Sequence, residues 1–177
     1  MKVAAITLLV CALVTQIVGR KAWDLLGYER GGEPWRYVTC HVVHASWAHL
    51  AFNAAVAAAA AWIFRRRIDG LALVLPAAAV SAGLYFLSPE IQRYIGFSGV
   101  LHGLLVCAML RAARAGEQIW WIGLALLGFK LAYEWFEGPV AGIEAAIGAP
   151  VLVRTHLYGA VGGALAGAFK GPQPPKK

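Results

Sequence analysis

Long apolar runs, separated by short charged or turn-forming segments, extend along the chain from residue 3 to residue 169. They predict six helices, at roughly 3–19, 46–64, 71–87, 97–110, 118–135 and 155–169. A helix needs about 20 apolar residues to cross the hydrocarbon core of a bilayer, within a range of about 17–25. Four of the runs meet this length, whereas 97–110 and 155–169 are short. The pattern therefore predicts an all-α, polytopic membrane protein with a bundle of six transmembrane helices.

Two longer connections and a tail separate or follow these runs. Residues 20–45 are expected to form an external loop whose aromatic residues suit a membrane interface, namely Trp23, Tyr28, Trp35 and Tyr37. Residues 136–154 form a second loop with Gly-Pro turn signals. The proline- and lysine-rich residues 171–177 are expected to be a disordered cytoplasmic tail, and residues 1–170 a single membrane domain.

The charge distribution predicts the orientation. The composition is 60% hydrophobic and 14% charged, and the formal net charge is +7. With the N-terminus in the cytoplasm, the segments on that side sum to +7 and those on the other side to zero, while Lys130 and Glu134 cancel within one run. Because positive charge concentrates on the cytoplasmic side of membrane proteins, both termini are expected there. No nucleic-acid partner is needed to explain the basic excess.

Several polar side chains interrupt the apolar runs, and in a membrane each is a functional candidate because its burial is costly. They are His44, His49, Asn53, Ser98, His102, Lys130, Glu134 and His156. Measured along each helix from its cytoplasmic basic end, Ser98, His156, His49 and Asn53 lie ~20, ~21, ~24 and ~18 Å from that face. Because two of the helices are short, irregular chain must lie above their outer ends. Such chain is tolerated only where protein buries it or water lines it, which predicts a wet cavity open to the outside.

The motif Gly96-Phe97-Ser98-Gly99 opens one of the short helices. A helix N-terminus offers free N–H groups and a positive dipole end, which suit a developing oxyanion. Serine needs a base, and His156 is at the right depth. No aspartate lies in the runs to orient the histidine, so a Ser-His dyad is expected.

Small residues provide a way to bring these two groups together. Gly159, Gly163 and Gly167 repeat at every fourth position after His156, a spacing that allows close helix contact. If this face meets Gly99 and Gly103, Ser98 and His156 come within hydrogen-bond reach. His49 and Asn53, four residues apart on one helix face, would then donate to the oxyanion together with the Ser98 N–H.

Each residue also has a structural interpretation. In this interpretation the glycines would be packing residues, and His49 and Asn53 would form an interhelical hydrogen-bonding pair. His41 and His156 would be solvated, and His44 and the Trp35-Arg36 pair would lie at the membrane interface. Lys130 and Glu134 would neutralise each other, with substrate contact as the alternative. The shared depth of Ser98, His156, His49 and Asn53 favours a site.

These motifs resemble the rhomboid intramembrane serine proteases in order, spacing and predicted helix placement. The resemblance rests on Trp35-Arg36, His44-Ala-Ser-Trp-Ala-His49-Leu-Ala-Phe-Asn53, Gly96-Phe97-Ser98-Gly99 and His156-x-x-Gly159. The stretch from Leu87 to Gly103 is similar to the rhombosortase branch of the family. It has His102 four residues after Ser98, where rhomboids commonly have tyrosine.

The resemblance implies Ser98 as nucleophile, His156 as general base, and His49, Asn53 and the Ser98 N–H as oxyanion hole, without metal or other cofactor. It implies supporting roles for Gly96, Gly99, His102, Gly159, Gly163, His44, Trp35 and Arg36. The implied substrates are secreted or surface proteins with a GlyGly-CTERM tail, which consists of a glycine-rich motif, one transmembrane helix and a basic cluster. Cleavage would occur in the inner membrane of a Gram-negative bacterium, with the active site open to the periplasm.

Two other functions stay open at this point. The first is a non-catalytic relative that binds transmembrane helices. The second is a metal or haem membrane protein, because five histidines are present. Elemental analysis of the purified protein distinguishes the second from a protease.

Overall fold

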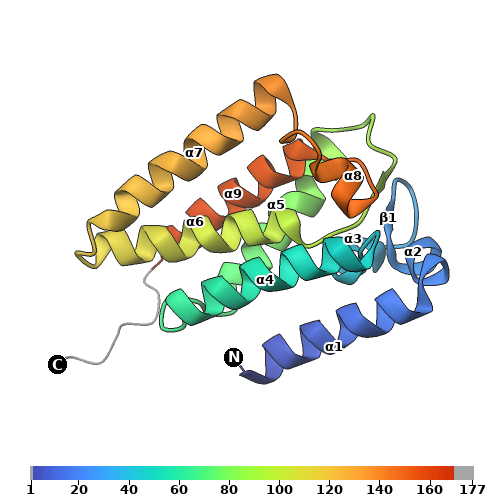
Figure 1. Ribbon diagram of the computed structural model, residues 1–177, viewed down its shortest axis with the longest axis horizontal. Coiled ribbons are helices and arrows are strands. Elements are labelled where there is room, and N and C mark those ends of the chain that lie inside the picture. Colours follow the sequence, from blue (N-terminus) through green and yellow to red (C-terminus); the bar gives the residue numbers. More distant parts are fainter. Residues whose placement is uncertain (1, 170–177) are drawn as a thin grey trace.

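Figure 1 shows a computed structural model, which describes residues 2–169 and the side chains from residue 6 onward. Six long helices run along the molecule: α1 (Lys2–Val18), α4 (Trp47–Ile63), α5 (Leu71–Phe86), α6 (Ser98–Arg114), α7 (Ile119–Glu137) and α9 (Val153–Ala168). Short elements gather at one end of this bundle: α2 (Arg20–Leu26), β1 (Tyr28–Glu29), α3 (Arg36–Thr39), the 3₁₀ helix η1 (Cys40–Val42), β2 (Arg93–Tyr94) and α8 (Ile143–Ile147). The predicted tail, 171–177, lies outside the described residues.

Each predicted apolar run overlaps one long helix over most of its length, so the helical class and the six long elements are confirmed. The expectation that the helix in the run at 97–110 is short is wrong. The α6 helix has 17 residues and continues through Arg111 to Arg114, which makes it as long as α4. The α9 helix has 16 residues and equals α5 in length. The apolar run ends earlier than α6 because Arg111 is buried and bound by carbonyl oxygens at Arg67 and Ala166.

The outer helices present apolar side chains to the surroundings. Ile17 of α1 and Leu126 and Phe129 of α7 are all more than half exposed. By length and composition, no single helix within residues 2–169 is sufficient to cross a membrane. Two bent pairs are sufficient: Ile6–Val18 with Arg20–Leu26, and Arg36–Val42 with Trp47–Ile63.

The α6 and α9 helices pack through their glycines, as the sequence predicts. A Cβ atom added to Gly159 would overlap the Gly99 carbonyl, and one added to Gly163 would overlap the Gly103 carbonyl. A Cβ on Gly103 would in turn overlap the Gly159 carbonyl. The two backbones are therefore in direct contact, which only residues without a side chain allow.

Charged residues close the opposite end of the bundle, away from the short elements. The Arg111 guanidinium lies 3.0 Å from Asp69 Oδ1, which also accepts a hydrogen bond from the Ala72 N–H at the start of α5. Burial alone would raise the pKa of Asp69, but the hydrogen bonds and the positive charge of Arg111 outweigh it and hold the pKa below its usual value. Asp69 is therefore an anion that fixes the α4–α5 turn to α6.

The segment 20–45, expected to be a loop, contains α2, β1, α3 and η1. Strands β1 and β2 pair antiparallel, with Tyr28 opposite Tyr94. The expectation that Tyr28 lies at a membrane interface is wrong, because it is 1% exposed in a cluster with Val80 and Leu84. Two-residue strands are too short to produce an alternating pattern, so the sequence does not reveal this pairing.

Replacing Gly159 by Ala is expected to destabilise the bundle by about 1–3 kcal/mol, because the added methyl group overpacks the α6–α9 contact. Thermal unfolding in detergent measures the effect. Gly128 of α7 is the matched control, since a Cβ there meets nothing within 4 Å. Equal losses of stability in Gly159→Ala and Gly128→Ala would contradict the proposed tight contact.

Candidate active site

A pair of short strands positions the chain that leads into α6. The Tyr94 hydroxyl donates to the Gly96 carbonyl at 2.7 Å, and the Gly96 N–H donates to the Cys40 carbonyl at 3.0 Å. Burial raises the pKa of Tyr94, so its hydroxyl stays a neutral donor. Gly96 has φ +123°, and a Cβ there would lie 2.9 Å from the His49 ring. Backbone conformation and lack of space both require glycine two residues before Ser98.

Ser98 begins α6, and its hydroxyl oxygen lies 3.1 Å from Nε2 of His156 in the first turns of α9. His156 is 5% exposed. A Cβ on Gly99 would lie 2.8 Å from the Thr155 carbonyl, so the backbones meet directly beside the two side chains. The glycine pattern predicts this hydrogen-bond distance, and the structure has it.

The other nitrogen of His156 faces a carboxylate. Nδ1 of His156 lies 2.9 Å from Oε2 of Glu134 on α7. Lys130, one turn before Glu134, lies 2.7 Å from the same oxygen, so the predicted ion pair is confirmed. The expectation of a histidine without an acidic partner is wrong. The i, i+4 spacing of Lys130 and Glu134 indicates their ion pair, but nothing in the sequence shows that the same carboxylate also reaches His156.

His102 lies on the face of His156. The two rings stack with centroids 4.0 Å apart and planes 16° from parallel. Nδ1 of His102 lies 2.7 Å from the Ser98 carbonyl oxygen, and its Nε2 lies 2.6 Å from Lys130 Nζ. His102 therefore contacts the backbone of Ser98, the ring of His156 and the charged pair of α7.

The α4 helix brings His49 beside the start of α6 and buries Asn53 one turn further on. Its N-cap residue, Ser46, accepts a hydrogen bond from the His49 N–H and donates one to the Ile147 carbonyl. His49 Nδ1 accepts from the Ala45 N–H, so Nε2 carries the ring proton beside Gly96. Asn53, one turn later, is 7% exposed, and its amide nitrogen has no hydrogen-bond partner among the described residues.

His44 and His41 are buried as well. The His44 ring meets the His49 ring edge to face, with centroids 5.0 Å apart, and neither of its nitrogens has a partner among the described residues. His41 is 4% exposed, so the expectation that it is solvated is wrong. His41 belongs to η1, and its Nε2 lies 3.5 Å from the Ser81 hydroxyl on α5.

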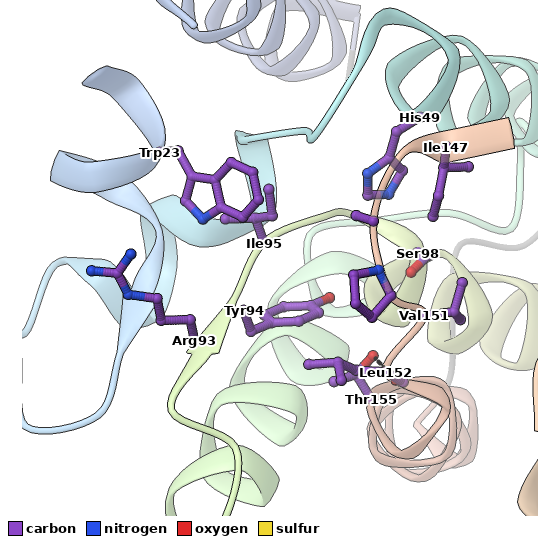
Figure 2. A pocket seen from close by; sticks show the side chains of 12 residues that line it. Trp23, His49, Arg93, Tyr94, Ile95, Ser98, Ile147, Val151, Leu152 and Thr155 are labelled. Atoms are coloured by element: carbon purple, nitrogen blue, oxygen red, sulfur yellow. Dashed lines mark hydrogen bonds between the residues drawn. The ribbon is translucent and has the colours of Figure 1, made fainter. Parts of the chain in front are cut away.

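A cavity of about 140 Å³ opens beside Ser98, with His49, Tyr94 and Ser98 facing the same space (Figure 2). Its wall comes from α2, the first turn of α4, β2 and the residue after it, the start of α6 and the segment from α8 into α9, namely Trp23, His49, Arg93, Tyr94, Ile95, Ser98, Ile147, Ala149, Pro150, Val151, Leu152 and Thr155. A cavity is therefore present beside Ser98, but of the four side chains expected to line it only Ser98 and His49 do, whereas His156 and Asn53 are not part of its wall. Nothing in the sequence pattern points to Tyr94 or to the segment after α8 as its wall.

Trp35 and Arg36 lie outside this wall. The Trp35 indole donates to the Leu25 carbonyl, while the buried Arg36 guanidinium donates to the Gly27 carbonyl and pairs with Glu29 and Glu33. These contacts hold the chain around β1, and β1 in turn pairs with β2 next to the site. Their contribution to the site is therefore indirect.

Three side chains of the site have the donor set of a metal centre. One ligand atom each from His102, Glu134 and His156 lies within 4.8 Å of the others. The Lys130 ammonium already lies at hydrogen-bond distance from His102 and Glu134. A divalent cation would have to displace this positive charge, because two cations so close repel each other.

The family model of the rhomboid domain matches residues 31–173, which is most of the chain. The chain belongs to the rhomboid family. Comparison with curated proteins gives no match, and neither does comparison with solved structures. A rhomboid domain indicates an intramembrane serine protease with transmembrane substrates, and it makes this rhomboid a multi-pass membrane protein.

Replacing Gly96 by Ala is expected to slow the reaction of Ser98 with a fluorophosphonate probe about 100-fold, because the methyl group must displace His49 or the turn before Ser98. Gly31→Ala is the matched control. Gly31 also has positive φ, +77°, but a Cβ there meets nothing within 4 Å. Wild-type reaction rates in Gly96→Ala would contradict this account of the turn.

Proposed function

We propose that this rhomboid is an intramembrane serine endopeptidase in which Ser98 is the nucleophile and His156 the general base. The observation that supports the assignment is the 3.1 Å contact between the Ser98 hydroxyl and His156 Nε2 beside a cavity. A serine hydroxyl is a weak nucleophile until an adjacent base removes its proton. The first turn of α6 supplies free N–H groups at the same point.

The reaction follows from this geometry. His156 takes the proton of Ser98 as the oxygen attacks the scissile carbonyl, which forms a tetrahedral intermediate. The imidazolium then protonates the leaving amine, and an acyl-enzyme is left on Ser98. Water entering from the outer side hydrolyses this ester by the reverse sequence of proton transfers, with His156 again as base.

The negative oxygen of the intermediate needs donors that are in place before the reaction. We assign this role to His49 Nε2, the amide of Asn53 and the Ser98 N–H. The buried, unpartnered amide nitrogen of Asn53 supports the assignment, because such a group is costly unless a ligand satisfies it. Donors fixed in advance stabilise the transition state without reorganisation.

The substrate we propose is a membrane-anchored protein with a GlyGly-CTERM tail. The resemblance to rhombosortases supports this choice, including His102 four residues after the nucleophile. A Gly-Gly pair weakens a substrate helix and exposes its backbone to attack. The small cavity beside Ser98, walled by Tyr94, Pro150 and Val151, suits residues without bulky side chains.

The orientation we propose has both termini in the cytoplasm of a bacterial cell and the cavity facing the periplasm, in the inner membrane. Arg65, Arg66, Arg67, Arg111 and Arg114 supply positive charge at the end of the bundle opposite Ser98. The positive-inside rule assigns that end to the cytoplasm.

Ser98→Ala and His156→Ala are each expected to abolish cleavage of a co-expressed tail protein without changing the amount of enzyme, because each removes a group that the reaction requires. Mass spectrometry of the substrate's new C-terminus measures cleavage. Cys11→Ala, at an exposed position of α1, is the control. Retained cleavage in either site variant would overturn the mechanism. Binding of the tail by wild-type protein without a new C-terminus would instead favour a non-catalytic helix-binding relative.

Asn53→Leu is expected to lower kcat about 100-fold or more, because it removes an oxyanion donor while keeping the number and branching of the side-chain heavy atoms. The melting temperature should not fall, since the amide nitrogen has no partner to lose. Rate assays and thermal unfolding on the same preparation test both statements. A loss of stability together with an unchanged rate would assign Asn53 a structural role only. The rate of His49→Ala tests the second donor, while its stability also reflects the lost hydrogen bond from the Ala45 N–H.

A further inference from the structure

Glu134 occupies an unusual place on α7. Among the described residues of this helix it alone is buried, at 5% exposed, while apolar neighbours such as Trp135 and Phe136 face outward. A carboxylate is normally placed in solvent and an apolar residue inside. The contacts of Glu134 therefore need a specific explanation.

The hydrogen bonds around His156 determine where its proton lies. For His156 Nε2 to accept the proton of Ser98, the neutral ring must carry its own proton on Nδ1. Nδ1 has two neighbours, Glu134 Oε2 at 2.9 Å and Lys130 Nζ at 3.4 Å. The carboxylate is the closer neighbour and accepts only, so it selects the tautomer that leaves Nε2 free.

The hydrogen bonds of Lys130 determine which nitrogen of His102 carries the proton. Its ammonium group only donates, so at 2.6 Å the Nε2 of His102 must accept from it. His102 then carries its proton on Nδ1 and donates to the Ser98 carbonyl at 2.7 Å. Lys130 also donates to Glu134 at 2.7 Å. Each proton in the network thus has one defined acceptor.

The charges of Lys130 and Glu134 also fit the proposed proton transfer to His156. The Lys130–Glu134 pair is neutral in the resting site, which limits the cost of burying it. When His156 takes the Ser98 proton, the new imidazolium lies between the Glu134 carboxylate and the stacked, neutral His102 ring. The carboxylate stabilises the positive charge that appears in that step.

We propose that Glu134 is a positioning residue that completes a Ser98–His156–Glu134 triad, with Lys130 fixing the carboxylate and the His102 tautomer. This inference rests on the proposed function, because it assigns Glu134 to the reaction in which Ser98 is the nucleophile. The alternative is a purely structural ion pair between residues four apart on one helix. The two differ in whether kcat depends on the carboxylate when the fold is intact.

The test compares Glu134→Gln, Glu134→Asp and Lys130→Met with wild-type enzyme in proteoliposomes, using one tail substrate. Glu134→Gln keeps the shape but removes the negative charge that stabilises the imidazolium, so kcat should fall about 100-fold or more with KM within about twofold. Glu134→Asp should recover about tenfold or more of that loss, because it restores a carboxylate. Lys130→Met should lose less, since the carboxylate is still present. Glu137→Gln, exposed on the same helix, is the matched control and should act as wild type.

A double variant, Lys130→Met with Glu134→Leu, removes the charged pair together and controls for folding. The triad predicts a stable protein whose kcat stays at the Glu134→Gln level. Wild-type kcat in Glu134→Gln or in this double variant would overturn the triad. Failure of the proposed function would look different, because then wild-type enzyme would not cleave, or Ser98→Ala would cleave equally well.

Discussion

The direct backbone contact between α6 and α9 is the constraint on which the site depends. Gly99 and Gly103 face Gly159 and Gly163, and any side chain at these positions would overlap a carbonyl of the opposite helix. The contact places the first residue of α6 beside the first turns of α9, so that Ser98 and His156 meet. A wider helix separation would leave the hydroxyl without a base. The packing of two helices and the contact between Ser98 and His156 therefore have the same cause.

The polar groups where α6, α7 and α9 meet are hydrogen-bonded to one another in an apolar bundle. An unpaired buried charge or donor is costly, and here the ammonium of Lys130, the carboxylate of Glu134 and the imidazoles of His102 and His156 contact one another within 3.4 Å. The amide nitrogen of Asn53 is different, because it has no partner among the described residues. A buried donor of this kind fits a ligand that brings its own oxygen.

Much of this arrangement follows from the sequence, for identifiable reasons. Apolar runs predict the six long helices, and glycine spacing predicts the meeting of Ser98 with His156, because both depend on local periodicity. The sequence does not predict that α6 continues to Arg114. Arg111 can be buried within the helix only because carbonyl oxygens distant in sequence, at Arg67 and Ala166, accept its hydrogen bonds. The sequence does not predict the pairing of β1 with β2 or the position of Tyr94, because two-residue strands are too short to show an alternation of apolar and polar residues. Glu134 is visible as a charge within an apolar run, but only the packing of α7 shows that His156 is its partner.

The central claim is that the hydroxyl of Ser98 reacts in a site whose donors are already in place. The most direct measurement is an experimental structure, in lipid, of the protein after reaction with a fluorophosphonate. The account predicts phosphorus bonded to Ser98 Oγ, with the phosphonyl oxygen within hydrogen-bond distance of His49 or Asn53 and the substituent in the cavity beside Tyr94. Phosphorus bonded to another residue, or a phosphonyl oxygen directed away from α4, would contradict it.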